Sequence, residues 1–501
     1  MKKTITLLVF SFFSFSTVFG QNAVLHILLA NGKNVSGSGY IPGQPKTGSF
    51  NLMIKDNGKA SYTFLLARPE FAQLRFYDSN NNNSKYFTYL FYLTPGDNLV
   101  LNADFNAPDF AIKVSGKGSK NNQPLLSAME SIDLHGFYRD TLPYRVINVI
   151  NAAQKNRQNN LEKYIRLYNP SPSYINDQKI SLRYYACDLY YNFKTSNKNH
   201  VWEAYYRNYA RWEKITDSLF RAATLDNDAA LTAFNYTMLI SGFLYGEMIN
   251  LSDQEYLHPE AFYREWYHTD TVEGKKQFSA DRKNLPQEKI INRYFTGKTA
   301  EYLYAVLFAR ALSESCPQNI PEIFGRFKAR YPNSKYIAQF KQPVNDIIIQ
   351  QKQTLKGSMV FMADNGTKFN TLDEVLEAMK GKTVLVDMWG TWCGPCREEI
   401  QKNSAAIRAH FKDKGLTYLY IANLDLDHQE QWKKLIAWFD MEGTHLLAND
   451  KLTDDIMAKV KGQGYPTVFI IKKDGSFEAS KAGRPMERDI LFKQLEACLA
   501  Q

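Results

Sequence analysis

Two cysteines separated by two residues, Cys393 and Cys396, are the side chains of this 501-residue sequence best suited to covalent chemistry. They follow a strand-like run at 383–388 and directly precede a helix-like run. At the N-terminus of a helix, unpaired N–H groups and the helix dipole stabilise a thiolate, and this spacing lets one sulfur reach the other. We therefore expect a redox-active centre that exchanges disulfides.

Cys393 is the predicted nucleophile, because it precedes the helix and is expected to be the more exposed sulfur of the pair. A cysteine in this setting can have its pKa lowered from about 8.5 to about 7 or below, which leaves a useful fraction as thiolate at neutral pH. Cys396 lies one turn inside the helix. We expect it to resolve the mixed disulfide that Cys393 forms.

Asp387 is the candidate base for the second thiol. It is the only charged residue of the apolar strand-like run that precedes the cysteines. A buried carboxylate is costly to keep charged, so its pKa should rise and let it shuttle a proton through water. The alternative is an aspartate that only caps a neighbouring helix or turn.

The sequence around the cysteines resembles thioredoxin. The similarity lies in Val-Asp-Met-Trp at 386–389 and Trp-Cys-Gly-Pro-Cys at 392–396, and Arg-Glu-Glu at 397–399 is similar to the exported TlpA/ResA-type branch. This resemblance covers residues 357–501 and implies an α/β thioredoxin fold for that domain, with no cofactor and no metal. It also implies an added amino-terminal hairpin, expected at 359–370 with its turn at Asp364-Asn365-Gly366.

The resemblance implies a substrate platform beside the disulfide. The family holds the proline that corresponds to Pro466 in the cis form, so the peptide groups of the preceding residue, here Tyr465, can pair with a bound polypeptide. The alternative is a proline that only begins a strand. Trp392 is expected to shield the disulfide rim and Trp389 to pack in the core. Gln401 stands where the family often has a kinking proline, so a straighter helix is expected.

Two further domains are expected upstream, because a chain of this length is too long for one core. From 21 to 121, strand-like runs separated by turn residues predict an antiparallel β-sandwich or barrel. The expected strands are 23–29, 50–55, 60–66, 73–76, 86–93, 98–104 and 110–114. From 122 to 356 the apolar period becomes helical and predicts an all-α domain. Its tyrosine-rich stretches, such as Tyr184-Tyr185 and Tyr190-Tyr191, either pack helices together or line a groove for a peptide or glycan.

Residues 1–20 have the pattern of a secretory signal peptide. Lys2 and Lys3 precede an apolar run at 5–19, which is shorter than the about 20 residues that a membrane span needs. We therefore expect export to the periplasm or cell envelope. An uncleaved membrane anchor is the alternative.

Composition excludes several other classes of protein. The formal charge is +10, but basic and acidic residues are mixed along the chain, so nucleic acid is not an expected partner. Cys187, Cys316 and Cys498 are scattered and odd in number beside the Cys393/Cys396 pair, which argues against a disulfide-stapled scaffold. The histidines and cysteines do not match a zinc-binding spacing.

These observations predict an envelope thiol:disulfide oxidoreductase, preferentially a reductase, whose upstream domains position a protein or peptide substrate. A reductase in an oxidising compartment has to be recharged, so a membrane-borne electron donor is an expected partner. Two alternatives stay open: a ligand-binding or scaffold protein with an accessory thioredoxin domain, and a disulfide oxidase or isomerase on the same fold.

Overall fold

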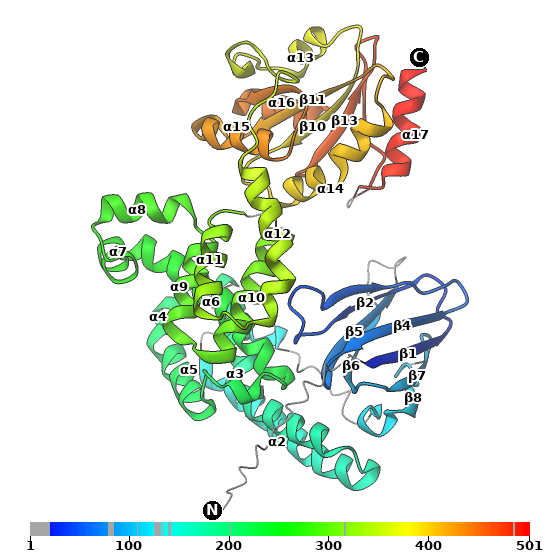
Figure 1. The fold of residues 1–501 in the computed structure, drawn as a ribbon, viewed down its shortest axis with the longest axis vertical. Helices are drawn as coiled ribbons and strands as arrows, with labels where there is room; N and C mark the ends of the chain where they lie inside the picture. The colour runs from blue at the N-terminus through cyan, green and yellow to red at the C-terminus, as the bar shows by residue number, and fades with distance from the viewer. Residues whose placement is uncertain are drawn as a thin grey trace, which may run out of the picture. The chain divides into compact units, whose positions relative to one another are not determined.

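The computed structural model describes residues 21–78, 85–107, 109–124, 132, 134–138, 142–200, 202–314, 317–483 and 486–500 (Figure 1). The predicted signal peptide, 1–20, lies outside them. Contacts divide the chain into two compact units. The first runs to Lys276 and includes Pro286–Val306, and the second contains Gln277–Leu285 and Leu307–Gln501. These units differ from the predicted limits at 121 and 356, which follow the change of secondary structure.

The first unit begins with two four-stranded sheets, ordered β4-β1-β7-β8 and β3-β2-β5-β6. The strands are β1 Gln21–Ala30, β2 Val35–Tyr40, β3 Ser49–Leu52, β4 Lys59–Leu66, β5 Glu70–Asp78, β6 Tyr86–Leu93, β7 Asn98–Asp104 and β8 Lys113–Lys117. The prediction of wholly antiparallel pairing is wrong at one place, because β1 and β7 are parallel. The chain passes through the other sheet, as β5 and β6, before it reaches β7, so β7 is not joined to β1 by a hairpin turn.

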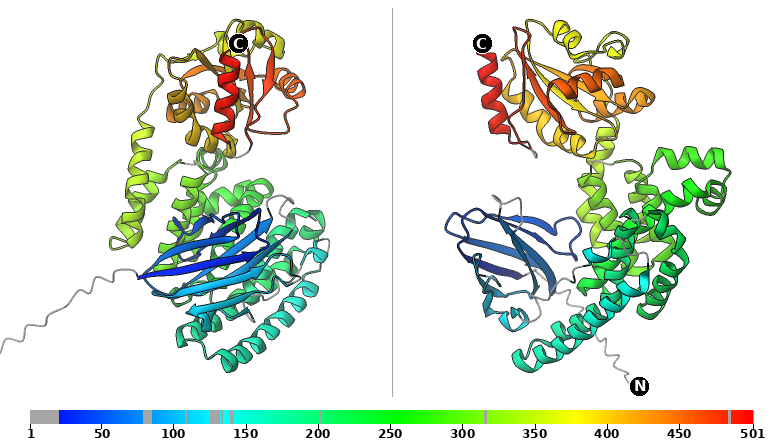
Figure 2. Two further views of the ribbon diagram at one scale, coloured as in Figure 1. Left: turned by 90° about the vertical axis from the view of Figure 1, so that its right-hand side faces the viewer. Right: turned by 180° about the vertical axis from the view of Figure 1, so that it is seen from behind.

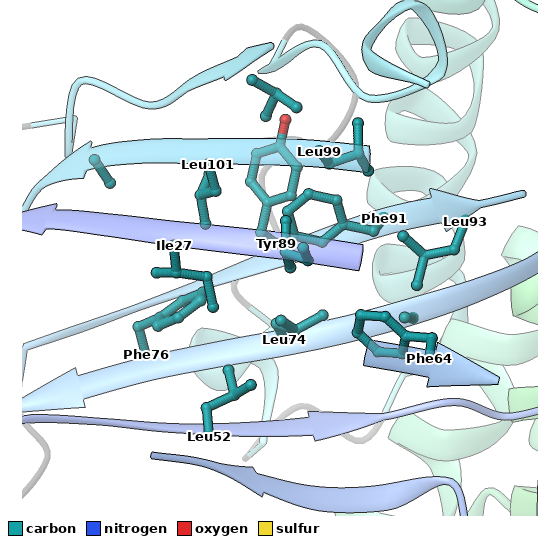
Figure 3. Close-up of a cluster of buried hydrophobic side chains, with 14 of the residues drawn as sticks. Ile27, Leu52, Phe64, Leu74, Phe76, Tyr89, Phe91, Leu93, Leu99 and Leu101 are labelled. Atoms are coloured by element: carbon teal, nitrogen blue, oxygen red, sulfur yellow. The ribbon is translucent and has the colours of Figure 1, made fainter. Parts of the chain in front are cut away.

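Side chains from both sheets meet in one apolar core (Figure 3). Ile27 and Leu101 come from the first sheet, and Leu74 and Phe76 come from the second. Along β7, buried positions alternate with more exposed ones, as expected for strands with a single buried face.

The sequence pattern did not predict β2. Its Gly37 and Gly39 lower the propensity for a strand. Gly39 pairs with Phe50 of β3, and a Cβ at Gly39 would lie 2.1 Å from the Phe50 ring. The glycine therefore leaves room for an aromatic ring of the neighbouring strand, a contact that no local pattern reveals.

Helices follow the sheets, and α3 Pro172–His200 packs along α6 Phe234–Leu257. The other α-helices among the described residues of this region are α2 Pro143–Tyr168, α4 Trp202–Arg207, α5 Tyr209–Ala223, α7 Pro259–Tyr267, α8 Thr271–Ala280, α9 Asn284–Tyr294, α10 Gly297–Ser313, α11 Ile320–Arg330 and α12 Lys335–Gln351. Short 3-10 turns occur at Ser119–Asn121, His135–Phe137 and Asp228–Ala230. Tyr184, Tyr185, Tyr190 and Tyr191 are at most 3% exposed, so they pack helices together and do not line a groove.

The sheets and the first helices share a core within the first unit. Phe71 of β5 and Tyr92 of β6 pack with Tyr164 of α2 and Tyr174 of α3. The Tyr92 hydroxyl also donates a hydrogen bond to the Asp177 carboxylate at 2.8 Å. These contacts explain why the two predicted upstream regions fall into one compact unit up to Lys276.

The second unit ends in a six-stranded mixed sheet, ordered β14-β13-β10-β11-β12-β9. The strands are β9 Met359–Phe361, β10 Thr383–Trp389, β11 Leu416–Asn423, β12 Gly443–Ala448, β13 Thr467–Ile471 and β14 Phe477–Ala479. The helices are α13 Leu372–Ala378, α14 Gly394–His410, α15 Gln429–Trp438, α16 Asp450–Lys459 and α17 Arg488–Leu499, with 3-10 turns at Ala363–Gly366 and Leu426–His428. Strands and helices thus alternate along most of this domain, in agreement with the α/β fold that the resemblance implied.

Helices cover both faces of this sheet. Apolar residues of α13 and α16 pack on one face, and those of α14, α15 and α17 pack on the other. Figure 2 shows α17 lying along the sheet. β10 is therefore buried in the middle of the domain, between β13 and β11, and it leads directly into the cysteine motif.

The predicted hairpin at 359–370 is wrong. β9 pairs in parallel with β12, and the segment Ala363–Gly366 forms a 3-10 turn with positive φ at Asp364, Asn365 and Gly366. The Asp-Asn-Gly signal was thus correctly identified as a turn, but the chain leaves it toward α13 without forming a partner strand. Thr371 and Glu374 form a capping box at the start of α13.

Candidate active site

Cys393 and Cys396 are joined by a disulfide bond at the start of α14. Cys393 is the N-cap residue, and its sulfur accepts a hydrogen bond from the backbone N–H of Cys396 at 3.2 Å. Pro395 lies in the first turn, where the N–H that it lacks has no partner within the helix. Cys393 is 3% exposed and Cys396 is fully buried, so the predicted order of exposure holds by a small margin.

The start of α14 favours a negative charge on the sulfur of Cys393. The N–H groups of the first turn have no partner within the helix, and the dipole of this 17-residue helix has its positive end there. When the disulfide is reduced, the N–H of Cys396 can stabilise a thiolate at Cys393. This placement favours Cys393 as the nucleophilic sulfur once the disulfide is reduced.

Trp392 directly precedes Cys393 and is 48% exposed. Its indole N–H donates to the backbone oxygen of Asn423 at 3.0 Å, and its ring meets that of Tyr465 edge to face at 5.4 Å. Gly390 leaves room for the indole ring, since a Cβ at residue 390 would lie 2.4 Å from the indole nitrogen of Trp392. Trp389, by contrast, is fully buried in the core, as predicted.

The Tyr465–Pro466 peptide bond is cis, as the family resemblance implied. Tyr465 packs, partly buried, against the apolar cluster that contains both cysteines. The structure therefore brings Trp392 and Tyr465 together beside the disulfide, with Pro466 next along the chain.

Asp387 lies in the middle of β10, on the face of the sheet that α14 covers. Leu385 and Trp389 flank it on that face and pack in the clusters that include α14. Its Oδ1 atom is buried and has no hydrogen-bond partner among the described residues. Burial, followed by the negative charge of Glu399, raises the pKa of Asp387 to about 7. A carboxyl with such a pKa can accept and release protons at neutral pH.

Glu399 is a neighbour of Asp387 that the sequence analysis did not select as a site residue. It follows Cys396 by one helical turn, and its carboxylate accepts hydrogen bonds from the side chain of Asn403 at 2.6 Å and the backbone N–H of Met486 at 3.2 Å. The available signal was its three-residue spacing from Cys396, which places both residues on one side of α14.

Asp425 is a second residue that sequence reasoning missed. It follows β11, and its carboxylate accepts hydrogen bonds from the backbone N–H and the hydroxyl of Thr391, two residues before Cys393. Burial raises the pKa of Asp425, and the hydrogen bonds from Thr391 oppose that shift. No spacing in the sequence connects these two positions, because the sheet brings them together.

Comparison with known proteins assigns the part of the chain that contains this site. Residues 381–477 match the family described as thioredoxin-like. The C-terminal domain is thioredoxin-like.

The thioredoxin-like domain is similar to several bacterial proteins. It is 36% identical over 101 residues to the thiol-disulfide oxidoreductase ResA of Bacillus cereus, which covers 20% of this chain and 54% of ResA. It is 26% identical over 125 residues to the sporulation thiol-disulfide oxidoreductase A of Bacillus subtilis, which covers 23% of this chain and 68% of that protein. The chain thus spans about half the length of the ResA proteins it matches.

Solved structures of similar proteins match about a quarter of the chain. One is the thioredoxin domain of a thiol-disulfide oxidoreductase from Bacteroides vulgatus, 27% identical, covering 24% of this chain and 82% of that chain with a TM-score of 0.21. Another is a thiol:disulfide interchange protein from a Bacteroides species. It is 28% identical, and the match covers 25% of this chain and 78% of that chain with a TM-score of 0.21.

Two of the remaining cysteines, Cys187 and Cys498, are free thiols in helices other than α14. Cys187 is buried in α3, where its thiol donates to the backbone oxygen of Leu219 and burial raises its pKa to about 12. Cys498 is buried in α17 of the thioredoxin-like domain, and burial raises its pKa. Cys316 falls outside the described residues.

The described residues contain no group of three or more histidine, cysteine, aspartate and glutamate side chains placed to hold a metal ion. In the same part of the chain, none of the helices combines the length and apolar character needed to span a membrane.

Proposed function

We propose that this chain is an exported thiol:disulfide oxidoreductase that reduces disulfides of protein or peptide substrates through Cys393 and Cys396. The observation that carries the proposal is the disulfide at the N-cap of α14, where the Cys393 sulfur faces the N–H of Cys396. Similar proteins from Bacillus carry the name thiol-disulfide oxidoreductase, which favours the same activity.

In the reductive direction, the Cys393 thiolate attacks one sulfur of the substrate disulfide. A bond forms between Cys393 and that sulfur, and the other substrate sulfur leaves as a thiolate that takes a proton from solvent. The Cys396 thiol then loses its proton and attacks the Cys393 sulfur, which releases the second substrate sulfur. Two electrons pass to the substrate, and the Cys393–Cys396 disulfide forms again.

Asp387 is the proposed acceptor of the Cys396 proton. It lies under α14, its pKa is raised to about 7, and one of its oxygens is buried without a hydrogen-bond partner among the described residues. A base that is itself shielded from solvent can deprotonate a thiol that is fully buried.

Trp392, Tyr465 and Pro466 are the proposed contacts for the substrate polypeptide. An aromatic side chain as exposed as Trp392 gives apolar area next to the reacting sulfur, and its hydrogen bond to Asn423 fixes its position. In this proposal the first unit of the chain helps to hold the substrate.

Export of the protein to the periplasm or cell envelope is supported by the sequence pattern of residues 1–20. A protein that gives electrons to substrates in an oxidising compartment must regain them. We assign that role to a membrane-borne electron donor.

Reduction of insulin by dithiothreitol, followed by turbidity, tests the proposal on the full-length mature chain. We expect catalysis by the native protein and by the control Cys498→Ser, which changes a buried cysteine of the same domain. Cys393→Ser should be inactive. If the native chain does not exceed the uncatalysed rate, the oxidoreductase assignment is wrong and a binding or scaffold role is favoured.

A further inference from the structure

A small cavity lies beneath α14, on the same face of the sheet as Asp387. Its polar lining consists of Asp387 of β10, Ser404 of α14, and Tyr418 and Tyr420 of β11, and aliphatic side chains complete it. Its volume of about 20 Å³ is enough for one water molecule. A cavity with several polar groups holds water, whereas an apolar one of this size stays empty.

The register of the sheet places Asp387 and Tyr420 side by side. β10 and β11 are parallel, and Asp387 is the direct partner of Tyr420. Paired residues on neighbouring strands project from the same face, so both side chains point toward α14. The buried Oδ1 atom of Asp387, which has no hydrogen-bond partner among the described residues, belongs to this pair.

Packing fixes the ring of Tyr420. The residue is 5% exposed and belongs to the apolar cluster that contains Cys396. Its ring stacks on the imidazole of His445 from β12, with centroids 5.2 Å apart and planes 13° apart. Its hydroxyl forms hydrogen bonds with the side chains of Arg408 and Ser404 of α14, and Ser404 lines the same cavity.

We propose that this cavity binds one water molecule between the Asp387 carboxyl and the Tyr420 hydroxyl, and that Tyr420 is a positioning residue for proton transfer by Asp387. The inference rests on the proposed function, since it requires Asp387 to take the proton of Cys396. It adds to the proposed function a residue, Tyr420, that the motif at 392–396 does not contain.

The proton balance of the resolving step follows from this arrangement. The Asp387 carboxylate takes the proton of the Cys396 thiol, and the Cys396 sulfur then attacks Cys393 and displaces the substrate thiolate. Asp387 later gives its proton to the cavity water, which passes a proton on toward solvent. Tyr420 donates a hydrogen bond to the water and keeps its own proton, because burial raises its pKa to about 12.

Other charged and titratable groups around Asp387 come mainly from α14. They are Glu399, whose charge acts on Asp387, Arg408, whose charge acts on Tyr420, and the two cysteines once they are reduced. β11 contributes Tyr418 and Tyr420, and β13 contributes the uncharged Val468 to the cavity. Removing the hydroxyl of Tyr420 changes none of these charges at neutral pH.

The test is Tyr420→Phe in the full-length chain, with the resolving step followed by rapid mixing across pH. Loss of a hydrogen bond that favours the carboxylate should raise the pH midpoint of this step by about half a unit or more. Below the midpoint the step should be about three- to tenfold slower, and the attack by Cys393 should be unchanged. Tyr418→Phe is the matched control, because Tyr418 lines the same cavity but pairs with Leu385.

A double variant separates a positioning role from a structural one. In Asp387→Asn, adding Tyr420→Phe should cause no further slowing. A structural defect would instead slow both steps at every pH, and it would do so with or without Asp387. Carboxyl carbon NMR of labelled aspartate gives a second readout, in which the pKa of Asp387 should be higher in Tyr420→Phe than in the native chain.

Several results would overturn the inference. An unchanged pH midpoint in Tyr420→Phe, or an equal shift in Tyr418→Phe, excludes the role of Tyr420 while leaving Asp387 as the base. A crystal structure at high resolution with an empty cavity excludes the water site. If Asp387→Asn itself leaves the resolving step unchanged, the role proposed for Asp387 fails, and this inference fails with it.

Discussion

Asp425 accepts two hydrogen bonds from Thr391, one from its backbone N–H at 2.7 Å and one from its hydroxyl at 2.6 Å. Asp425 is 1% exposed and Thr391 is 5% exposed. The next residue along the chain, Trp392, donates a hydrogen bond from its indole N–H to the backbone oxygen of Asn423. The segment that leads into the cysteines is therefore attached at two consecutive residues to the end of β11.

Asp425→Ala should destabilise the oxidised protein. It would leave two buried donors of Thr391 unpaired, which is expected to lower the free energy of unfolding by about 2–4 kcal/mol. Asp425→Asn keeps the shape and one acceptor, so it should lower the free energy of unfolding by only about 1 kcal/mol. Denaturant unfolding followed by tryptophan fluorescence measures both. Equal small losses in the two variants would show that these hydrogen bonds do not hold the segment.

The two cysteines should behave differently when each is replaced in cells. Cys396→Ser keeps the nucleophile at the N-cap of α14 but cannot resolve the mixed disulfide, so covalent complexes with substrates should accumulate. Cys393→Ser should trap none, because the remaining sulfur is fully buried. Non-reducing gels compare them. Trapping by Cys393→Ser alone would reverse the assigned roles.

Stability should depend on pH through Asp387. Burial raises its pKa to about 7 in the folded protein, against about 3.9 in the unfolded chain. Between these values the folded state binds more protons at this site, so stability falls as the pH rises. Asp387→Asn lacks this titration and should gain stability relative to the native protein between about pH 4 and about pH 7. Unfolding curves at several pH values test this, and a constant difference between the two proteins would contradict it.

The local part of the site could be predicted from sequence, and the distant part could not. Cys393, Cys396 and Trp392 lie in one continuous motif, and the family resemblance supplied Pro466 and its cis bond. Asp425 reaches its partner only because β11 lies beside β10. Tyr420 meets Asp387 through the register of the same two strands, which no spacing along the chain encodes.

The same limit appears in the fold. Long strands with a clear period, such as β4, β6 and β7, were predicted nearly to their ends. β2 was missed because its glycines lower the strand propensity of the segment. Their role is to leave room for side chains of β3, which no local pattern reveals. β9 was given the wrong partner, because the sequence indicates a turn at Asp364 but not which strand the preceding segment joins.

Gly39→Ala tests the tertiary origin of β2. The new Cβ would meet the Phe50 ring at 2.1 Å, and that ring is stacked on Tyr62 with centroids 4.2 Å apart. Displacing it should cost about 1–3 kcal/mol. Gly325→Ala in α11 is the control, because nothing lies within 4 Å of its added Cβ and alanine is favoured there by about 1 kcal/mol. The midpoint of thermal unfolding should therefore fall in Gly39→Ala and rise in Gly325→Ala. A stabilised Gly39→Ala would refute the account of β2.

The reduction potential should place the protein among reductants. Gly394 and Pro395 stand between the cysteines, as in thioredoxin, whose potential is about −270 mV against about −120 mV for a strongly oxidising periplasmic enzyme. At about 1.4 kcal/mol per 30 mV, that gap is about 7 kcal/mol, which is more than one surface residue usually contributes. We therefore expect a potential below about −220 mV. Equilibration of the full-length chain in glutathione and dithiothreitol buffers gives the value, if mass spectrometry quantifies the peptide with Cys393 and Cys396 separately from the other cysteines. A potential near −120 mV would favour an oxidase with the same cysteines in the same places.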